Sequence, residues 1–216
     1  MRWASIFRMP PVRVASILTL TIFFSGCSAQ PPSAPANTAK TVPAASNSGA
    51  ALVTGTAAAG AIITLEPTVP RELPPPAHAS LMDQFGQQFL PDLVTARVGQ
   101  QVEFRSSEDV LHNVRVDHAE TGEPIFNIAT PSFSSYMHVF DKPGYYKVSC
   151  DVHPAMRASI FVASTPYVAV TDARGSFVVA DVEAGPYRVR VIDGDRTSEQ
   201  MVTVSAPRTE LALAHR

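Results

Sequence analysis

The feature that most limits how this chain can fold is a long series of short apolar stretches separated by turn residues. From residue 51 onward, no segment of about ten residues or more shows the apolar period of a helix. The stretches instead span about four to eight residues, with alternating or continuous apolar character between Gly, Pro, Asn and Asp turns. They are ALVTGT, AIITLEP, LVTARV, QVEFRS, LHNVRVDH, FSSYMHVF, GYYKVSC, ASIFVAS, YVAVTD, SFVVADV, RVRVID and MVTVSA. This pattern predicts an all-β chain.

Short strands at this spacing are typical of Greek-key β-sandwiches. We place the main boundary near residues 164–166, because residues 80–164 suffice for one sandwich whereas the strands that follow are too few for an independent core. We therefore predict that residues 51–67 and 166–206 together form a second, small sandwich, into which 80–164 is inserted. The proline-rich residues 71–91 are predicted to be a connection.

The N-terminus has the composition of a targeting segment. Residues 1–26 carry three arginines and no acid, and their apolar run 14–24 is too short to span a bilayer as a helix. The FSGC that follows resembles a bacterial lipobox, which implies lipidation of Cys27; the alternative is an ordinary secretory peptide cleaved nearby. Residues 27–50 are rich in Pro, Ala and Ser, which predicts a disordered tether. We expect an exported protein anchored by lipid to the periplasmic face of a bacterial membrane.

Charge and cysteine usage narrow the function further. The formal net charge is −2, without the basic stripe that nucleic-acid-binding domains use, so we expect no nucleic-acid partner. The chain has two cysteines, Cys27 and Cys150. Exported proteins usually pair their cysteines in disulfides, yet here lipidation of Cys27 would leave Cys150 alone. An unpaired cysteine in an oxidising compartment is either a liability or a reactive group with a function, and a metal ion would both protect it and use it.

A possible metal-binding pattern surrounds that cysteine. Cys150, His153 and Met156 follow one another at Cys-x-x-His-x-x-Met spacing, in a turn between two predicted strands. His112, on an earlier strand, supplies a second imidazole. Two imidazoles, one thiolate and one thioether match a type 1 copper site, with a trigonal His₂Cys plane and a weak axial Met. Pro154 would stiffen the turn because its ring fixes φ.

The chain resembles the cupredoxins, the small blue copper proteins. The loop CDVHPAM has the form of the short ligand loop of amicyanin, and HNV after the acidic SSEDVL is similar to the segment that carries the family's first ligand. This resemblance spans roughly residues 80–164 and implies one copper ion held by His112, Cys150, His153 and Met156. It also implies that Asn113 hydrogen-bonds across the ligand loops, and that electrons pass through His153 at the solvent edge.

Two further resemblances concern the whole chain and its second sandwich. The segments LMDQFGQQFLP, HNV, FDKPGYYKVSC and TPYVAVTDARGSF together resemble exported plastocyanin-like proteins of the methylamine-utilisation type. The stretch VTDARGSFVVADVEAGPYRVRV is similar to a carboxypeptidase regulatory-like, transthyretin-type sandwich. The first implies an exported copper protein, and the second implies the fold of residues 51–67 and 166–206.

Other interpretations of these residues stay open at this point. Taken singly, Cys150 is a typical buried residue, Met156 a typical core residue and His112 an ordinary strand histidine. Zinc also accepts sulfur and nitrogen ligands, although a thioether suits it poorly. A dinuclear copper centre needs a second cysteine in the loop, and a copper enzyme needs a second ion with open coordination.

We therefore expect a non-enzymatic electron carrier. One copper ion would take up single electrons from a redox donor protein and pass them to an acceptor protein, while the lipid on Cys27 keeps the carrier at the membrane. The alternative is a copper-binding protein for acquisition, storage or delivery. No nucleophile with its base and no phosphate-binding loop is apparent in the sequence.

Overall fold

The computed structural model describes residues 49–76 and 78–213. In this part of the chain it contains sixteen strands and no helix, so the predicted all-β fold class is confirmed. No helix in these residues is long and apolar enough to cross a membrane. The predicted signal peptide 1–26, the lipidation site Cys27 and nearly all of the tether 27–50 lie outside the described residues.

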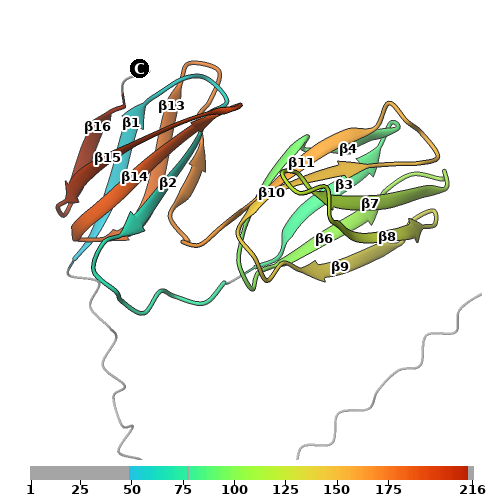
Figure 1. Ribbon diagram of the computed structural model, residues 1–216, viewed down its shortest axis with the longest axis horizontal. Helices are drawn as coiled ribbons and strands as arrows, with labels where there is room; N and C mark the ends of the chain where they lie inside the picture. Colours follow the sequence, from blue (N-terminus) through green and yellow to red (C-terminus); the bar gives the residue numbers. More distant parts are fainter. Residues whose placement is uncertain (1–48, 77, 214–216) are drawn as a thin grey trace, which may run out of the picture. The chain divides into compact units, whose positions relative to one another are not determined.

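The central part of the chain forms a sandwich of two sheets (Figure 1). Their strand orders are β5-β11-β10-β7-β8 and β4-β3-β6-β9. The nine strands are β3 (Ser80–Phe85), β4 (Gln88–Leu90), β5 (Leu93–Arg97), β6 (Gln101–Ser106), β7 (His112–His118), β8 (Pro124–Thr130), β9 (Ser135–Val139), β10 (Gly144–Ser149) and β11 (Arg157–Ala163). Most neighbours are antiparallel, and two pairs, β3 with β6 and β5 with β11, are parallel.

The remaining strands form a second, smaller sandwich. They are β1 (Ala50–Thr56), β2 (Ile62–Pro67), β12 (Val168–Val170), β13 (Ser176–Glu183), β14 (Gly185–Asp193), β15 (Arg196–Val204) and β16 (Arg208–Ala212). Strand β1 lies between β13 and β16, and β2 lies between β12 and β14. The early strands thus pair with the late ones. Strand β16 lies beyond residue 206, where the sequence pattern ended.

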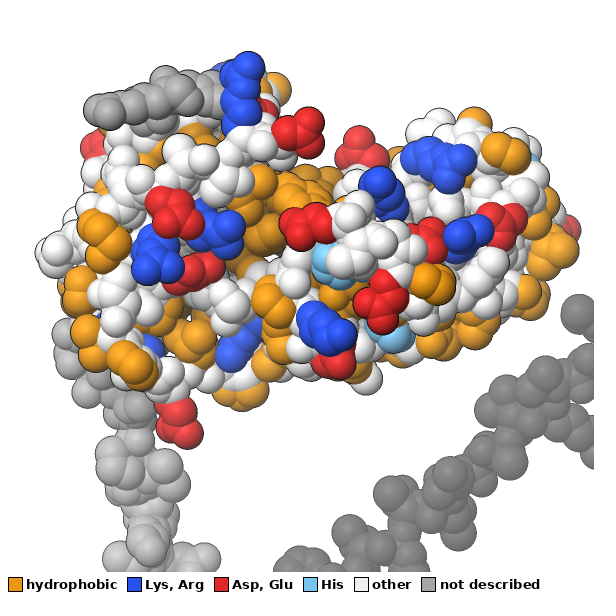
Figure 2. All heavy atoms as spheres, viewed as in Figure 1, with side chains coloured by type: hydrophobic (Ala, Val, Ile, Leu, Met, Phe, Trp, Pro, Cys, Tyr) orange, Lys and Arg blue, Asp and Glu red, His pale blue; other side chains and the backbone are white. Residues whose placement is uncertain are grey.

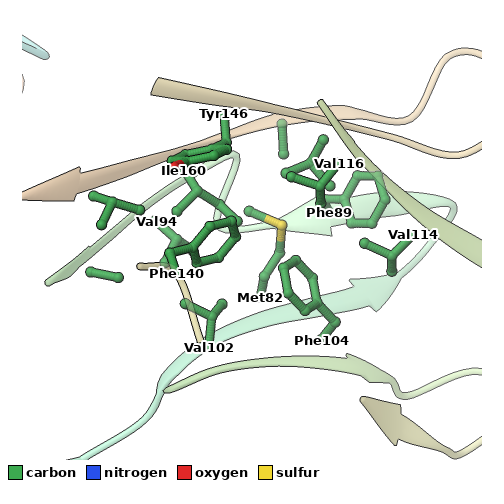
Figure 3. Packing of buried hydrophobic residues seen from close by; sticks show 14 of the residues in the cluster. Met82, Phe89, Val94, Val102, Phe104, Val114, Val116, Phe140, Tyr146 and Ile160 are labelled. Atoms are coloured by element: carbon green, nitrogen blue, oxygen red, sulfur yellow. The ribbon is translucent and has the colours of Figure 1, made fainter. Parts of the chain in front are cut away.

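Alternation of side chains explains why the central strands pack as they do. In β6, Val102 and Phe104 are fully buried, and in β10 Tyr146 and Val148 are buried while the intervening Lys147 is exposed. The inward side chains of both sheets form one hydrophobic cluster, and Figure 3 shows Met82 among its aromatic rings. Burial of such side chains is the main stabilising contribution to a sandwich of this kind.

Three strands of the central sandwich were not among the predicted ones. The predicted connection over residues 71–91 is wrong for β3 and β4, which lie within it, and PIFNIAT, which is not among the predicted strands, forms β8. The reason in β3 is Gln84, a fully buried polar residue that interrupts the apolar pattern. It accepts a hydrogen bond from Thr130 Oγ1 (3.1 Å) and donates one to the carbonyl of Arg105 (3.3 Å), so its burial is compensated.

Charged side chains of both signs are interspersed on the face of the molecule seen in Figure 2. The structure also contains ion pairs, and Arg190, for example, lies 3.7 Å from Glu66 and 3.1 Å from Glu199. A continuous basic surface is therefore not present on this face.

The strand register brings the ends of four strands, β7, β8, β10 and β11, to one edge of the five-stranded sheet. His112 opens β7 opposite Thr130, the last residue of β8. Ser149, the last residue of β10, pairs with Arg115 on β7 and with Arg157, the first residue of β11. The loop between β10 and β11 therefore emerges beside the start of β7. Residues that are far apart in sequence, 112 and 150–156, become neighbours at this edge.

Candidate metal centre

Three side chains with metal-binding atoms meet at this edge of the sandwich: His112, Cys150 and His153. The Cys150 Sγ lies 4.0 Å from His112 Nδ1 and 3.9 Å from His153 Nδ1, and the two Nδ1 atoms are 3.1 Å apart. These distances place the three atoms about 2.1 Å from a common point, close to the ~2.0–2.3 Å of metal bonds to nitrogen and sulfur. The residues present therefore fit a single metal ion.

Burial divides the group into an inner and an outer part. His112 is fully buried and Cys150 is 1% exposed, whereas His153 is only half-buried. Two imidazole nitrogens and one thiolate are donors that both copper and zinc accept. An ion held here would be shielded from water on the inner side and approachable through the His153 ring.

The loop that carries two of these donors is closed by its own backbone. Met156 N–H donates to the His153 carbonyl (2.9 Å), and Cys150 N–H donates to the Met156 carbonyl (3.3 Å). Pro154 lies exposed in the turn between them. The Met156 side chain is 1% exposed and belongs to the same hydrophobic cluster as Cys150. The loop is thus compact, and its last residue is fixed in the core.

Asn113 joins this loop to the sheet. Its Oδ1 accepts hydrogen bonds from the backbone N–H groups of Asp151 (2.6 Å) and Val152 (3.3 Å), and lies 3.3 Å from the Cys150 Sγ. Its Nδ2 donates to Asn127 Oδ1 (2.8 Å) and to Asp151 Oδ2 (3.1 Å), and Asn127 donates to the same carboxylate oxygen (2.8 Å). One side chain therefore connects β7, the edge strand β8 and the ligand loop.

Glu108 is a contact of this centre that sequence reasoning missed. Its Oε1 lies 2.8 Å from His112 Nε2, the ring nitrogen that faces away from Cys150. The carboxylate also accepts the backbone N–H groups of Gln87 and Gly86, each at 3.0 Å. The Gln87 N–H lowers the pKa of Glu108 most, followed by the hydrogen bonds from His112 and Gly86, against an opposing effect of desolvation.

The sequence contained only a weak signal for this contact. Glu108 lies four residues before His112 within the acidic SSEDVL segment, beside a second acid, Asp109. The irregular backbone between β6 and β7 determines which of these two acidic side chains turns inward. Apolar sequence patterns carry no information about the conformation of such a segment. Asn127 and Asp151 were missed for a similar reason, because neither belongs to an apolar pattern.

Comparisons with known proteins give likenesses of fold over part of the chain. The sequence matches no protein-family model and no curated protein. An amicyanin from Paracoccus versutus is 21% identical, with a TM-score of 0.37, over 49% of this chain and 100% of its own. A purple cupredoxin from Nitrosopumilus maritimus is 22% identical, with a TM-score of 0.35, over 39% of this chain and 99% of its own.

A copper-containing nitrite reductase from Thermus scotoductus is 24% identical, with a TM-score of 0.37, over 45% of this chain and 25% of its own. The amicyanin and the purple cupredoxin are both cupredoxins, and each covers less than half of this chain. The structural neighbours of this chain thus include cupredoxins.

Proposed function

We propose that this chain is a type 1 copper protein that carries single electrons between redox partners. The proposal rests on the convergence of His112 Nδ1, Cys150 Sγ and His153 Nδ1, which lie within 4.0 Å of one another. A thiolate and two imidazoles form the trigonal plane of a blue copper site. When bound, copper supplies the one-electron couple, and the protein carries out no bond chemistry.

The donor residues would have distinct roles in holding the ion. Cys150 would bind as a thiolate, and both histidines would bind as neutral imidazoles through Nδ1. Met156 would supply a thioether as a further, weak ligand, which its burial in the same hydrophobic cluster as Cys150 supports. Asn113 would keep the loop in one conformation through its bonds to Asp151 and Val152. A cage that changes little between the two oxidation states needs little reorganisation, which favours fast electron transfer.

Electrons would enter and leave through His153. Its imidazole is the donor ring that reaches solvent, since His112 is fully buried. A donor and an acceptor protein would therefore dock in turn where this ring is exposed. The N-terminal sequence supports an exported location, with the lipid on Cys27 and the tether 27–50 keeping the folded part within reach of partners on the periplasmic face of the membrane.

A redox cycle monitored by visible absorption tests this function. One equivalent of Cu(II) should produce an intense band, ascorbate should bleach it, and ferricyanide should restore it over repeated cycles with the copper retained. Zn(II) added first should occupy the same donors without producing colour. When Cu(II) is then added, the band should appear more slowly than in the zinc-free protein. Absence of any band on copper addition would contradict the proposal. Transfer of the copper to a chelator after reduction would instead indicate copper acquisition, storage or delivery.

A further inference from the structure

We propose that Glu108 is a positioning residue of this metal centre, and that it couples the β3–β4 hairpin to His112. This inference deepens the proposed function and rests on it where copper is concerned. Three hydrogen bonds meet at the Glu108 carboxylate, and their donors are His112 Nε2, Gly86 N–H and Gln87 N–H.

The hairpin presents its turn amides to this carboxylate. Gly86 and Gln87 both have positive φ, at 62° and 54°, which is the conformation of a two-residue turn between antiparallel strands. Their N–H groups bond to the two different oxygens of Glu108. The side chain of Phe85, beside the turn, is 57% exposed. A change in the position of Glu108 would therefore displace the turn, and the reverse also holds.

The bond to His112 selects one form of the imidazole. A carboxylate accepts hydrogen bonds, so the ring proton sits on Nε2 and the lone pair is left on Nδ1, which faces Cys150 and His153. His112 is fully buried and the Glu108 side chain is 15% exposed, so water competes weakly for this bond. The pairing orients the ring toward the metal before any metal is bound, and it makes the ring a stronger donor.

The negative charge has an effect of its own. A carboxylate hydrogen-bonded to a ligand favours the more highly charged ion, so it should stabilise Cu(II) relative to Cu(I) and lower the reduction potential. Glu108→Ala should therefore weaken Cu(II) binding by about 10- to 100-fold. Glu108→Gln retains the size and one acceptor oxygen but loses the charge, so it should raise the reduction potential with a smaller loss of affinity.

The chain offers a matched control in the neighbouring acid. Asp109 is exposed, so Asp109→Asn removes the same charge without disturbing His112. We expect this variant to differ from the wild type by less than about twofold in affinity, with a smaller change of potential than Glu108→Gln, because exposed charges are screened.

The metal-free full-length protein provides a readout that does not depend on copper. In the wild type, nitrogen and proton NMR should show His112 protonated at Nε2, and slow hydrogen exchange at the amides of Gly86 and Gln87. Glu108→Gln should speed the exchange of at least one of these amides, because its side-chain NH₂ cannot accept a hydrogen bond. Asp109→Asn should leave both unchanged.

The two proposals can fail separately. If the wild type gives no blue band but the metal-free signatures are present, the electron-transfer function fails and the structural role of Glu108 holds. If the wild type is blue and Glu108→Gln matches Asp109→Asn in potential, affinity and amide exchange, the inference is overturned. Glu108→Gln decides the matter if Glu108→Ala does not fold.

Discussion

Replacing Cys150 by serine should abolish the intense visible band of the copper-loaded protein. The band arises from charge transfer between a thiolate and Cu(II), and Cys150 is the free cysteine of the described residues. A serine hydroxyl is a poor, neutral donor that cannot supply the thiolate of the trigonal plane. The variant should still fold, because one hydroxyl in a buried position costs about 1–3 kcal/mol.

The second cysteine of the chain provides the control for this experiment. Cys27→Ser leaves the donor group untouched and should give the same band at the same copper stoichiometry as the wild type. Circular dichroism should show that both variants retain β structure. A band that survives in Cys150→Ser, or that disappears in Cys27→Ser, would remove Cys150 from the proposed site.

Asn113→Ala should have the largest effect on the ligand loop of any change outside the donors. The substitution removes the acceptor of the Asp151 and Val152 N–H groups and both hydrogen bonds that Nδ2 donates. We expect a loss of about 3 kcal/mol in the free energy of unfolding, which lowers Tm by about 6–12 °C. Copper affinity should fall by about 10- to 100-fold, because the loop is no longer held to β7.

Asn127→Ala tests whether this effect belongs to the loop. Asn127 is exposed, and it contacts Asn113 and the Asp151 carboxylate but not the loop backbone. The variant should lose about 1 kcal/mol, with the copper band unchanged. Thermal unfolding and copper titration of both variants would separate the two roles. Equal losses of affinity in the two would show that the side-chain network, rather than the Asn113 acceptor, holds the loop.

The apolar pattern predicted much of the fold, for a physical reason. An alternating strand such as QVEFRS buries every second residue, and β6 has this arrangement, with Val102 and Phe104 in the core. The pattern failed where polar residues are buried. Gln84 is fully enclosed because Thr130 and the Arg105 carbonyl satisfy its amide, and those partners come from other strands. Hydropathy alone could not have located strand β3 for this reason.

The candidate site, like the fold, could be predicted only in part. The spacing of Cys150, His153 and Met156 in one turn indicated a candidate donor loop, and the chemistry of the set pointed to His112 as a candidate for the second imidazole. The positions of Glu108 and Asn127 depend on the strand register and on the turn at residues 86–87, which the sequence does not encode in a local pattern. Residue type and spacing thus pointed to the candidate donors His112, Cys150 and His153, which lie close together in the structure, whereas their hydrogen-bond partners required the three-dimensional structure.

Diffraction from crystals of the copper-loaded protein, measured on both sides of the copper absorption edge, would show whether one copper ion binds to these three side chains. We expect a single anomalous peak within bonding distance of His112 Nδ1, Cys150 Sγ and His153 Nδ1. A peak bound elsewhere on the surface, or a centre in which His112 or Cys150 does not contact the metal, would contradict this expectation.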